Sequence, residues 1–253
     1  MTSSEKTLAI VLRVVEFSET SVVVTLFTQQ FGKVSALAKG ARRPKGPFES
    51  ALDLLSLVRI VFLHKSSESL DLLTEAKLER RFRSASRDLG RLYAGYYVAE
   101  LLHELTDRGD PHPALFEAAD EALQSIDAGV PLPTVVLRME LSALQEVGHM
   151  PTLDRCAACS DAIRPASDRV AFGMMAGGLL CDKCRHGQRQ IVSVSHEAIE
   201  VLRVVSELGP SAWKSMEVPL AVRGELRGVM GNYLSHLLGH RPRMHELLGY
   251  LAK

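Results

Sequence analysis

The sequence predicts an α+β chain of several domains, in which a small β-barrel or sandwich precedes a helical part. Over the first 75 or so residues apolar and polar side chains alternate, as they do in half-buried strands. From about residue 76 apolar side chains recur every three or four residues, as on the buried face of a helix. All four cysteines lie in two C-x-x-C pairs within the helical part, which predicts a small inserted module.

Five short strands are expected in the N-terminal part, because polar turns interrupt the alternation and no helical pattern intervenes. We expect these strands near residues 10–15, 22–28, 34–38, 52–63 and 70–75. The stretch 39–47, between the third and fourth strands, combines basic residues with glycine and proline. This composition predicts an exposed loop.

Six helices are expected after the strands, most of them ended by glycine or proline. They are predicted at residues 78–105, 114–126, 134–147, 194–208, 220–238 and 244–251. The domain boundaries that follow are a barrel at 1–76, a first helical part at 77–155, the cysteine insertion at 156–190 and a second helical part at 191–253.

The composition describes an ordinary globular protein. The 253 residues are 46% hydrophobic, and 30 basic residues balance 30 acidic ones. A uniformly basic coat is excluded, so any nucleic acid would have to meet a local basic patch. The N-terminus lacks a secretory pattern, and no apolar stretch approaches the roughly 20 residues of a membrane helix. The sequence thus predicts a soluble, cytoplasmic protein without a membrane partner.

The two cysteine pairs are the most specific signal. Cys156 and Cys159 form the first pair, and Cys181 and Cys184 form the second. Two such turns can close a tetrahedral sulfur shell that suits Zn²⁺. A complete shell has no open position, so we expect one structural zinc ion per chain. The alternatives are thioredoxin-like redox pairs or buried apolar cysteines, although neither pair sits between a predicted strand and helix.

Basic residues gather in the loop after the third strand and on the first predicted helix, where they could hold phosphate groups. The candidates for DNA binding are Lys33, Lys39, Arg42, Arg43, Lys45, Arg80, Arg83 and Arg87. Phe31 and Phe48 are candidates for stacking on bases. The alternative is a solvated loop whose charges only keep the protein soluble.

Motifs of catalysis are missing from the sequence. It has no phosphate-binding G-x-x-x-x-G-K-[ST] loop, no G-x-G-x-x-G, no G-x-S-x-G and no H-E-x-x-H. No set of residues therefore indicates an enzyme.

The order of several short motifs resembles the RecO family of bacterial recombination mediators over nearly the full length. Besides the four cysteines, the matching residues are Ala9-Ile10-Val11-Leu12, Glu19, Leu26-Phe27-Thr28, Gly32, Ala38-Lys39-Gly40-Ala41-Arg42, Phe172 and Gly177-Gly178. The sequence departs from the family at Ser160, where glycine is common, and at Arg243-Met244-His245, where Lys-Ser-Arg is usual.

The resemblance implies an N-terminal OB-fold, a helical domain and a zinc-binding insertion. It also implies binding of single- and double-stranded DNA, annealing of complementary strands, and assistance to RecA loading together with RecR and RecF. Relatives dock the acidic, Phe-ended tail of the single-strand DNA-binding protein on the helical domain. Such a site should be an apolar pocket beside one or two cations. The candidate cations are Arg223, Arg227, Arg241 and Arg243.

Two other functions stay open at this point. The chain could be an adaptor whose barrel and cysteine module bind proteins, with an incidental basic loop. It could also be a zinc-ribbon enzyme, such as a nuclease or transferase, although no cluster of carboxylates supports that function.

Overall fold

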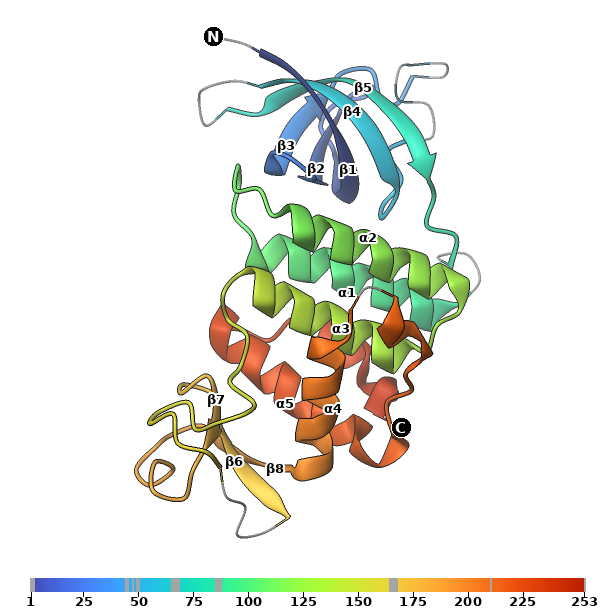
Figure 1. Ribbon diagram of the computed structural model, residues 1–253. Coiled ribbons are helices and arrows are strands. Elements are labelled where there is room, and N and C mark those ends of the chain that lie inside the picture. The colour runs from blue at the N-terminus through green and yellow to red at the C-terminus, as the bar shows by residue number, and fades with distance from the viewer. Residues whose placement is uncertain are drawn as a thin grey trace. The chain divides into compact units, whose positions relative to one another are not determined.

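The computed structural model of the chain describes residues 3–43, 46, 48, 51–64, 69–84, 88–163, 168–209 and 211–252. The chain divides into two compact units, Met1–Ala128 and Gly129–Lys253 (Figure 1). No helix within the described residues is long and apolar enough to cross a membrane.

Five strands of the first unit close into a barrel, drawn in blue and cyan in Figure 1. They are β1 (Ser3–Glu16), β2 (Val22–Thr28), β3 (Gly32–Ala38), β4 (Leu57–His64) and β5 (Asp71–Arg80). The strand order is β1-β2-β3-β5-β4; β3 and β5 run parallel, and the other neighbours run antiparallel. This is the five-stranded barrel of an OB-fold, so the predicted N-terminal fold is confirmed.

Alternation along the strands builds the barrel core. In β2, Val22 and Val24 are buried, whereas Val23 between them is partly exposed. Ala36 and Ala38 point inward from β3 in the same way. Because the side-chain period of a strand is two, each strand contributes one apolar face to the interior.

The helix predicted from residue 78 begins later in the structure. Strand β5 continues to Arg80, and α1 (Leu89–Leu105) starts after Asp88, whose side chain accepts a hydrogen bond from the Arg91 N–H. The predicted start of the helix was wrong because the position of Leu78 fits the two-residue period of a strand as well as the period of a helix. In the structure Leu78 pairs with Val58 of β4. The arginines expected on one helix face therefore do not share a helix. Arg80 ends β5, Arg83 follows it, and Arg87 lies outside the described residues.

The other helices agree closely with the predicted ranges. In the first unit α2 (Pro113–Ala128) packs on α1. The second unit contains α3 (Leu132–Glu146), α4 (His196–Glu207), α5 (Leu220–Leu238) and α6 (Met244–Leu247), with short 3₁₀ helices at Ala212–Ser215 and Gly249–Ala252. A small sheet of order β7-β6-β8 joins them, formed by β6 (Arg169–Gly173), β7 (Gly178–Leu180) and β8 (Ile191–Ser195). This sheet was not predicted, because its strands are only three to five residues long.

Candidate metal centre and nucleic-acid interface

The four cysteines meet at one point of the second unit. Their sulfur atoms all lie within 4.8 Å of one another, and the Sγ atoms of Cys159 and Cys181 are 3.8 Å apart. Residues 22 positions apart are thus brought together. Four sulfur donors in one cluster fit a soft, tetrahedrally coordinated metal ion. A redox pair would need only two of the four cysteines.

Backbone hydrogen bonds hold the two cysteine turns on strand β7. The Leu179 N–H donates to the Thr152 carbonyl over 2.9 Å, and the Ala157 N–H donates to the Leu179 carbonyl over 2.7 Å. Gly178 permits this close approach, because a Cβ there would lie 2.4 Å from the Thr152 carbonyl oxygen. The glycine pair ahead of Cys181 therefore joins the first cysteine loop to the second.

The first cysteine turn ends in a left-handed residue. Ser160 has φ of 62°, and its N–H donates to the Cys156 carbonyl over 2.8 Å. Glycine adopts this conformation without steric cost, whereas other residues adopt it at a cost of about 1 kcal/mol. The serine at this position thus carries strain that a glycine would avoid.

The thiol pKa values within the cluster are split. Burial alone raises the pKa of Cys156, but N–H groups of Cys181, Cys159 and Ala158 point at its sulfur and lower the pKa to about 6. Hydrogen bonds among the thiols, chiefly from Cys159 and Cys181, raise the pKa of Cys184 to about 12. The fold therefore favours the thiolate form of Cys156 and the thiol form of Cys184.

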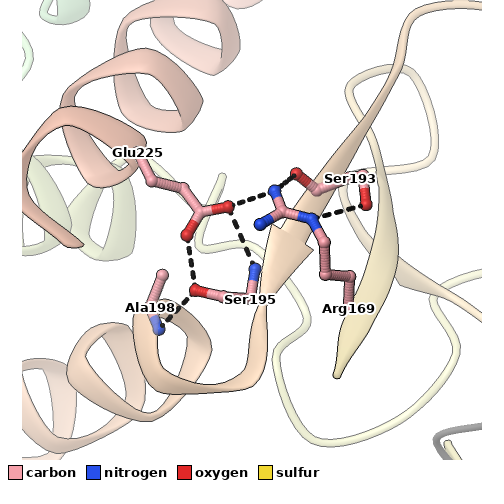
Figure 2. A network of polar contacts seen from close by, with 5 residues as sticks. All are labelled: Arg169, Ser193, Ser195, Ala198 and Glu225. Atoms are coloured by element: carbon pink, nitrogen blue, oxygen red, sulfur yellow. Dashed lines mark hydrogen bonds and ion pairs between the residues drawn. The ribbon is translucent and has the colours of Figure 1, made fainter. Parts of the chain in front are cut away.

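A polar network fixes the small sheet to the helices (Figure 2). The Glu225 carboxylate of α5 accepts hydrogen bonds from Arg169 of β6 at 2.5 Å, from the Ser195 N–H at 3.0 Å and from the Ser195 hydroxyl. The Ser195 oxygen in turn accepts the Ala198 N–H at 3.2 Å and so caps α4. Glu225 thus joins β6, β8 and α4 at one carboxylate.

The basic loop lies at one end of the barrel. Its Lys39, Arg42 and Arg43 are exposed. The Arg42 N–H donates to the Thr20 carbonyl over 3.0 Å and the Gly40 N–H to the Ser21 hydroxyl oxygen over 3.4 Å, so the loop is tied to the β1–β2 turn. Lys45 lies outside the described residues.

The Arg42 side chain contacts an acid that water also reaches. Its Nη1 is 3.0 Å from the Glu16 carboxylate, with side chains 43% and 73% exposed. An exposed pair of this kind contributes at most about 1 kcal/mol, so a phosphate can replace the carboxylate.

Lys33 does not belong to this patch. It lies at the opposite end of β3 from Lys39, about 20 Å away at the rise of a strand. Its Nζ donates to the carbonyl of His103 in the last turn of α1 at 2.5 Å and to that of Thr106, the residue after the helix, at 2.6 Å. Burial lowers the pKa of Lys33, and Asp107 opposes that shift. Lys33 therefore caps a helix end, a role that its sequence neighbourhood did not suggest.

Arg80 and Arg83 are held by acids of α2. The guanidinium of Arg80 donates to the Asp120 carboxylate. The main-chain N–H of Arg83 donates to the Asp127 carboxylate at 3.0 and 3.1 Å. These contacts fix the segment between β5 and α1, and they do not continue the patch formed by the basic loop.

The two phenylalanines expected to stack on bases belong to the barrel core. Phe31 packs edge-on against Phe62 with ring centroids 5.4 Å apart, and Phe48 is buried. The exposed aromatic residue near the basic loop is Phe17, in the β1–β2 turn. The position of Phe17 directly before a polar turn could have predicted its exposure, because side chains beyond the end of a strand are no longer packed in the core.

Two of the four candidate partner cations line an apolar cavity of the second unit. Arg223 and Arg227 of α5 border a small cavity of about 10 Å³, together with Pro133, Leu137, Glu140, Val218, Leu226 and Leu251. Arg223 donates to the Val218 carbonyl at 3.0 Å, and Arg227 lies 2.6 Å from Glu140. Arg241 contacts His245 instead, and Arg243 is exposed; neither lines this cavity.

The buried His245 contacts both Arg227 and Arg241. Its Nε2 lies 3.2 Å from the Arg227 carbonyl, and its Nδ1 lies 3.1 Å from Arg241. Burial lowers the pKa of His245, and the charge of Arg227 lowers it further. Because a carbonyl only accepts and a guanidinium only donates, the neutral ring donates through Nε2 to the Arg227 main chain and accepts through Nδ1 from the Arg241 side chain.

Comparison with known proteins places the whole chain in one family. The family model described as "Recombination protein O N terminal" matches residues 1–82, and the family model described as "Recombination protein O C terminal" matches residues 86–246. The chain is 41% identical to the DNA repair protein RecO of Rhodopirellula baltica, over 95% of this chain and 97% of the relative. Identity is 34% to the protein of that name from Anaeromyxobacter sp. strain K, over 96% and 95%. It is 32% to that from Myxococcus xanthus, over 96% of each chain. The chain therefore belongs to the RecO family of DNA repair and recombination proteins.

Proposed function

We propose that the protein is a recombination mediator that binds single- and double-stranded DNA, anneals complementary strands and works without catalytic turnover. The observation that carries this proposal is the basic loop. Lys39, Arg42 and Arg43 are exposed, and the backbone around them is tied to the β1–β2 turn. A preordered row of cations binds phosphates with little entropic cost and without reading sequence. Lys45 extends this row in the sequence.

Annealing follows from the same charge. Two complementary strands repel each other through their phosphates, and cations at one surface neutralise both backbones while leaving the bases to pair. We propose that with RecR and RecF the protein assists loading of RecA onto DNA covered by single-strand DNA-binding protein. This work belongs in the cytoplasm, at the nucleoid, where the DNA is.

The cysteine cluster supports one structural Zn²⁺ per chain. Cys156, Cys159, Cys181 and Cys184 would hold the ion, and four sulfur ligands leave no position for a substrate. The ion would contribute folding free energy to the small sheet. We propose 156–190 as the zinc insertion; the barrel domain, predicted at 1–76, extends to Arg80 because β5 ends there.

We infer that the acidic, Phe-ended tail of the single-strand DNA-binding protein docks beside Arg223, where a small apolar cavity would have to widen to admit the ring. Leu137, Leu226 and Leu251 line the cavity, and the Arg223 guanidinium borders it for a carboxylate, whereas Arg227 is already paired with the buried Glu140. Because this cavity could bind a protein segment, it also supports an adaptor function as a second function beside DNA binding.

An annealing assay with complementary oligonucleotides tests the proposal, in the presence and absence of single-strand DNA-binding protein. We expect Arg42→Glu combined with Arg43→Glu to weaken DNA binding and annealing strongly at low salt. Arg203→Glu is the matched control, because Arg203 is also exposed and paired with an exposed glutamate, Glu200. If the loop variant anneals like the wild type, the basic loop does not bind DNA and the adaptor function remains.

A further inference from the structure

An apolar row crosses the outer face of the barrel beside the basic loop. In β1 the side chain of Val14 packs on the core, so Val15 points outward, where it is 41% exposed. Val15 lies opposite Val23 of β2, and Val23 lies opposite Leu37 of β3. Both Val23 and Leu37 are partly exposed between buried neighbours. Three adjacent strands thus present aliphatic side chains to water at positions where a small barrel needs none for its core.

Phe17 extends this row beyond the end of β1. It follows Val15 by two residues and is 64% exposed. Its main chain is fixed, because the N–H groups of Phe17 and Ser18 donate to the Ser21 carbonyl at 3.0 and 3.2 Å. The neighbouring Thr20 carbonyl holds the Arg42 N–H. The exposed aromatic ring therefore lies on an ordered turn that is bonded to the main chain of Arg42.

Cations flank the row on both sides. Arg13 is exposed in β1 and pairs in register with Thr25, one step along the outer face from Val15 and Val23. Lys39, Arg42 and Arg43 lie at the other side, at the end of β3. Glu16 and Glu19 are the acids of the adjoining turn, so four cations stand against two acids. A ligand that covers this surface should combine apolar faces with negative charge.

We propose that the surface formed by Val15, Phe17, Val23 and Leu37, the base platform, binds the unpaired bases of single-stranded DNA. Phe17 stacks on one base, the aliphatic row supports its neighbours, and the flanking cations hold the phosphates. Single-stranded DNA has both required features, because its bases expose apolar faces and its backbone is anionic. A duplex hides those faces within its own stack. The inference rests on the proposed DNA binding and adds which part of the DNA the barrel contacts.

A tryptophan at position 17 reports stacking directly. The chain has one tryptophan, Trp213, which is 1% exposed and gives a constant background. In the F17W variant of the full chain we expect the added fluorescence to be quenched by a mixed-sequence single-stranded oligonucleotide and to be unchanged by a blunt duplex. L89W is the matched control, because Leu89 is 60% exposed and lies on α1, outside the platform. Its emission should respond to neither DNA.

Phe17→Ala measures the contribution of the ring. Base stacking predicts a loss of about 5- to 100-fold in affinity for the single strand, with unchanged affinity for the duplex. The dependence of affinity on salt should keep its slope, whereas Arg42→Glu should reduce it. Equal losses for both kinds of DNA would mean that Phe17 only shapes the loop, and that result overturns the proposal.

Failure of the proposed DNA binding and failure of the base platform give different results. If wild-type protein binds neither DNA, the proposed function falls together with the platform. If the wild type binds and F17W shows no quenching by the single strand, only the platform falls, and its apolar row is left to a protein partner.

Discussion

Removing one partner of the ion pair between Arg227 and Glu140 should destabilise the second unit by several kcal/mol. The side chains are 10% and 0% exposed, and their closest charged atoms are 2.6 Å apart. An uncompensated buried charge costs about 3–5 kcal/mol, against at most about 1 kcal/mol for a pair at the surface. Glu140→Gln keeps the shape of the side chain and removes the charge, so we expect a loss of about 3 kcal/mol.

Unfolding in urea, followed by tryptophan fluorescence, measures this loss. Trp213 is buried in the same unit as the pair, so its emission reports the unfolding of that unit. Glu200→Gln serves as the control, because it breaks an exposed pair with Arg203 and should cost less than about 1 kcal/mol. The comparison requires equal m-values, which show that both variants unfold to the same extent.

Replacing both charges separates the cost of burial from the value of the pair. Arg227→Met in the Glu140→Gln background removes both ions from the interior, and we expect it to recover most of the lost stability. A loss in Glu140→Gln no larger than that of the surface control would refute the reasoning. It would mean that water reaches the guanidinium of Arg227 when its partner is gone.

Three further predictions concern the metal centre and the sheet that carries it. Cys181→Ser should abolish metal retention, whereas wild-type protein purified without chelator should hold about one zinc per chain by elemental analysis. Ser160→Gly should stabilise the second unit by about 0.5–1 kcal/mol in urea unfolding, because glycine adopts its positive φ without strain; a loss of stability would contradict this. Glu225→Gln should cost about 1–2 kcal/mol at neutral pH. Burial raises the pKa of Glu225, but its bonds to Ser195 and Arg169 lower it to a net depressed value. The carboxylate therefore stabilises the fold above its unfolded pKa, and the difference between variant and wild type should vanish as pH falls through the folded pKa.

The features that the sequence predicted well depend on local patterns. The alternation of Val22, Val24 and Leu26 specifies a strand and its buried face, and two C-x-x-C turns specify a sulfur cluster wherever the chain places them. Helix ends were found where a glycine such as Gly239 stops the ladder with a positive φ.

The features that were missed depend on distance along a strand or on contacts between distant segments. Lys33 is near Lys39 in sequence, but a seven-residue strand separates them to opposite ends of the barrel. Leu78 fits a helical period, yet hydrogen bonds to β4 decide its conformation. The cavity beside Arg223 joins residues of α3, α5 and the last 3₁₀ helix, which no local pattern relates.

The neutral balance of 30 basic and 30 acidic residues conceals a division between two kinds of cation. Arg80 is held by Asp120, Arg227 by a buried glutamate and Lys33 by main-chain carbonyls, so exchanging these partners would cost stability. Arg42 instead meets Glu16 in water, at a site where the pair contributes little. Net charge therefore says little about affinity for DNA in this chain. What matters is which cations can exchange a carboxylate for a phosphate at little structural cost, and among the described residues of the basic loop Arg42 is placed to do so.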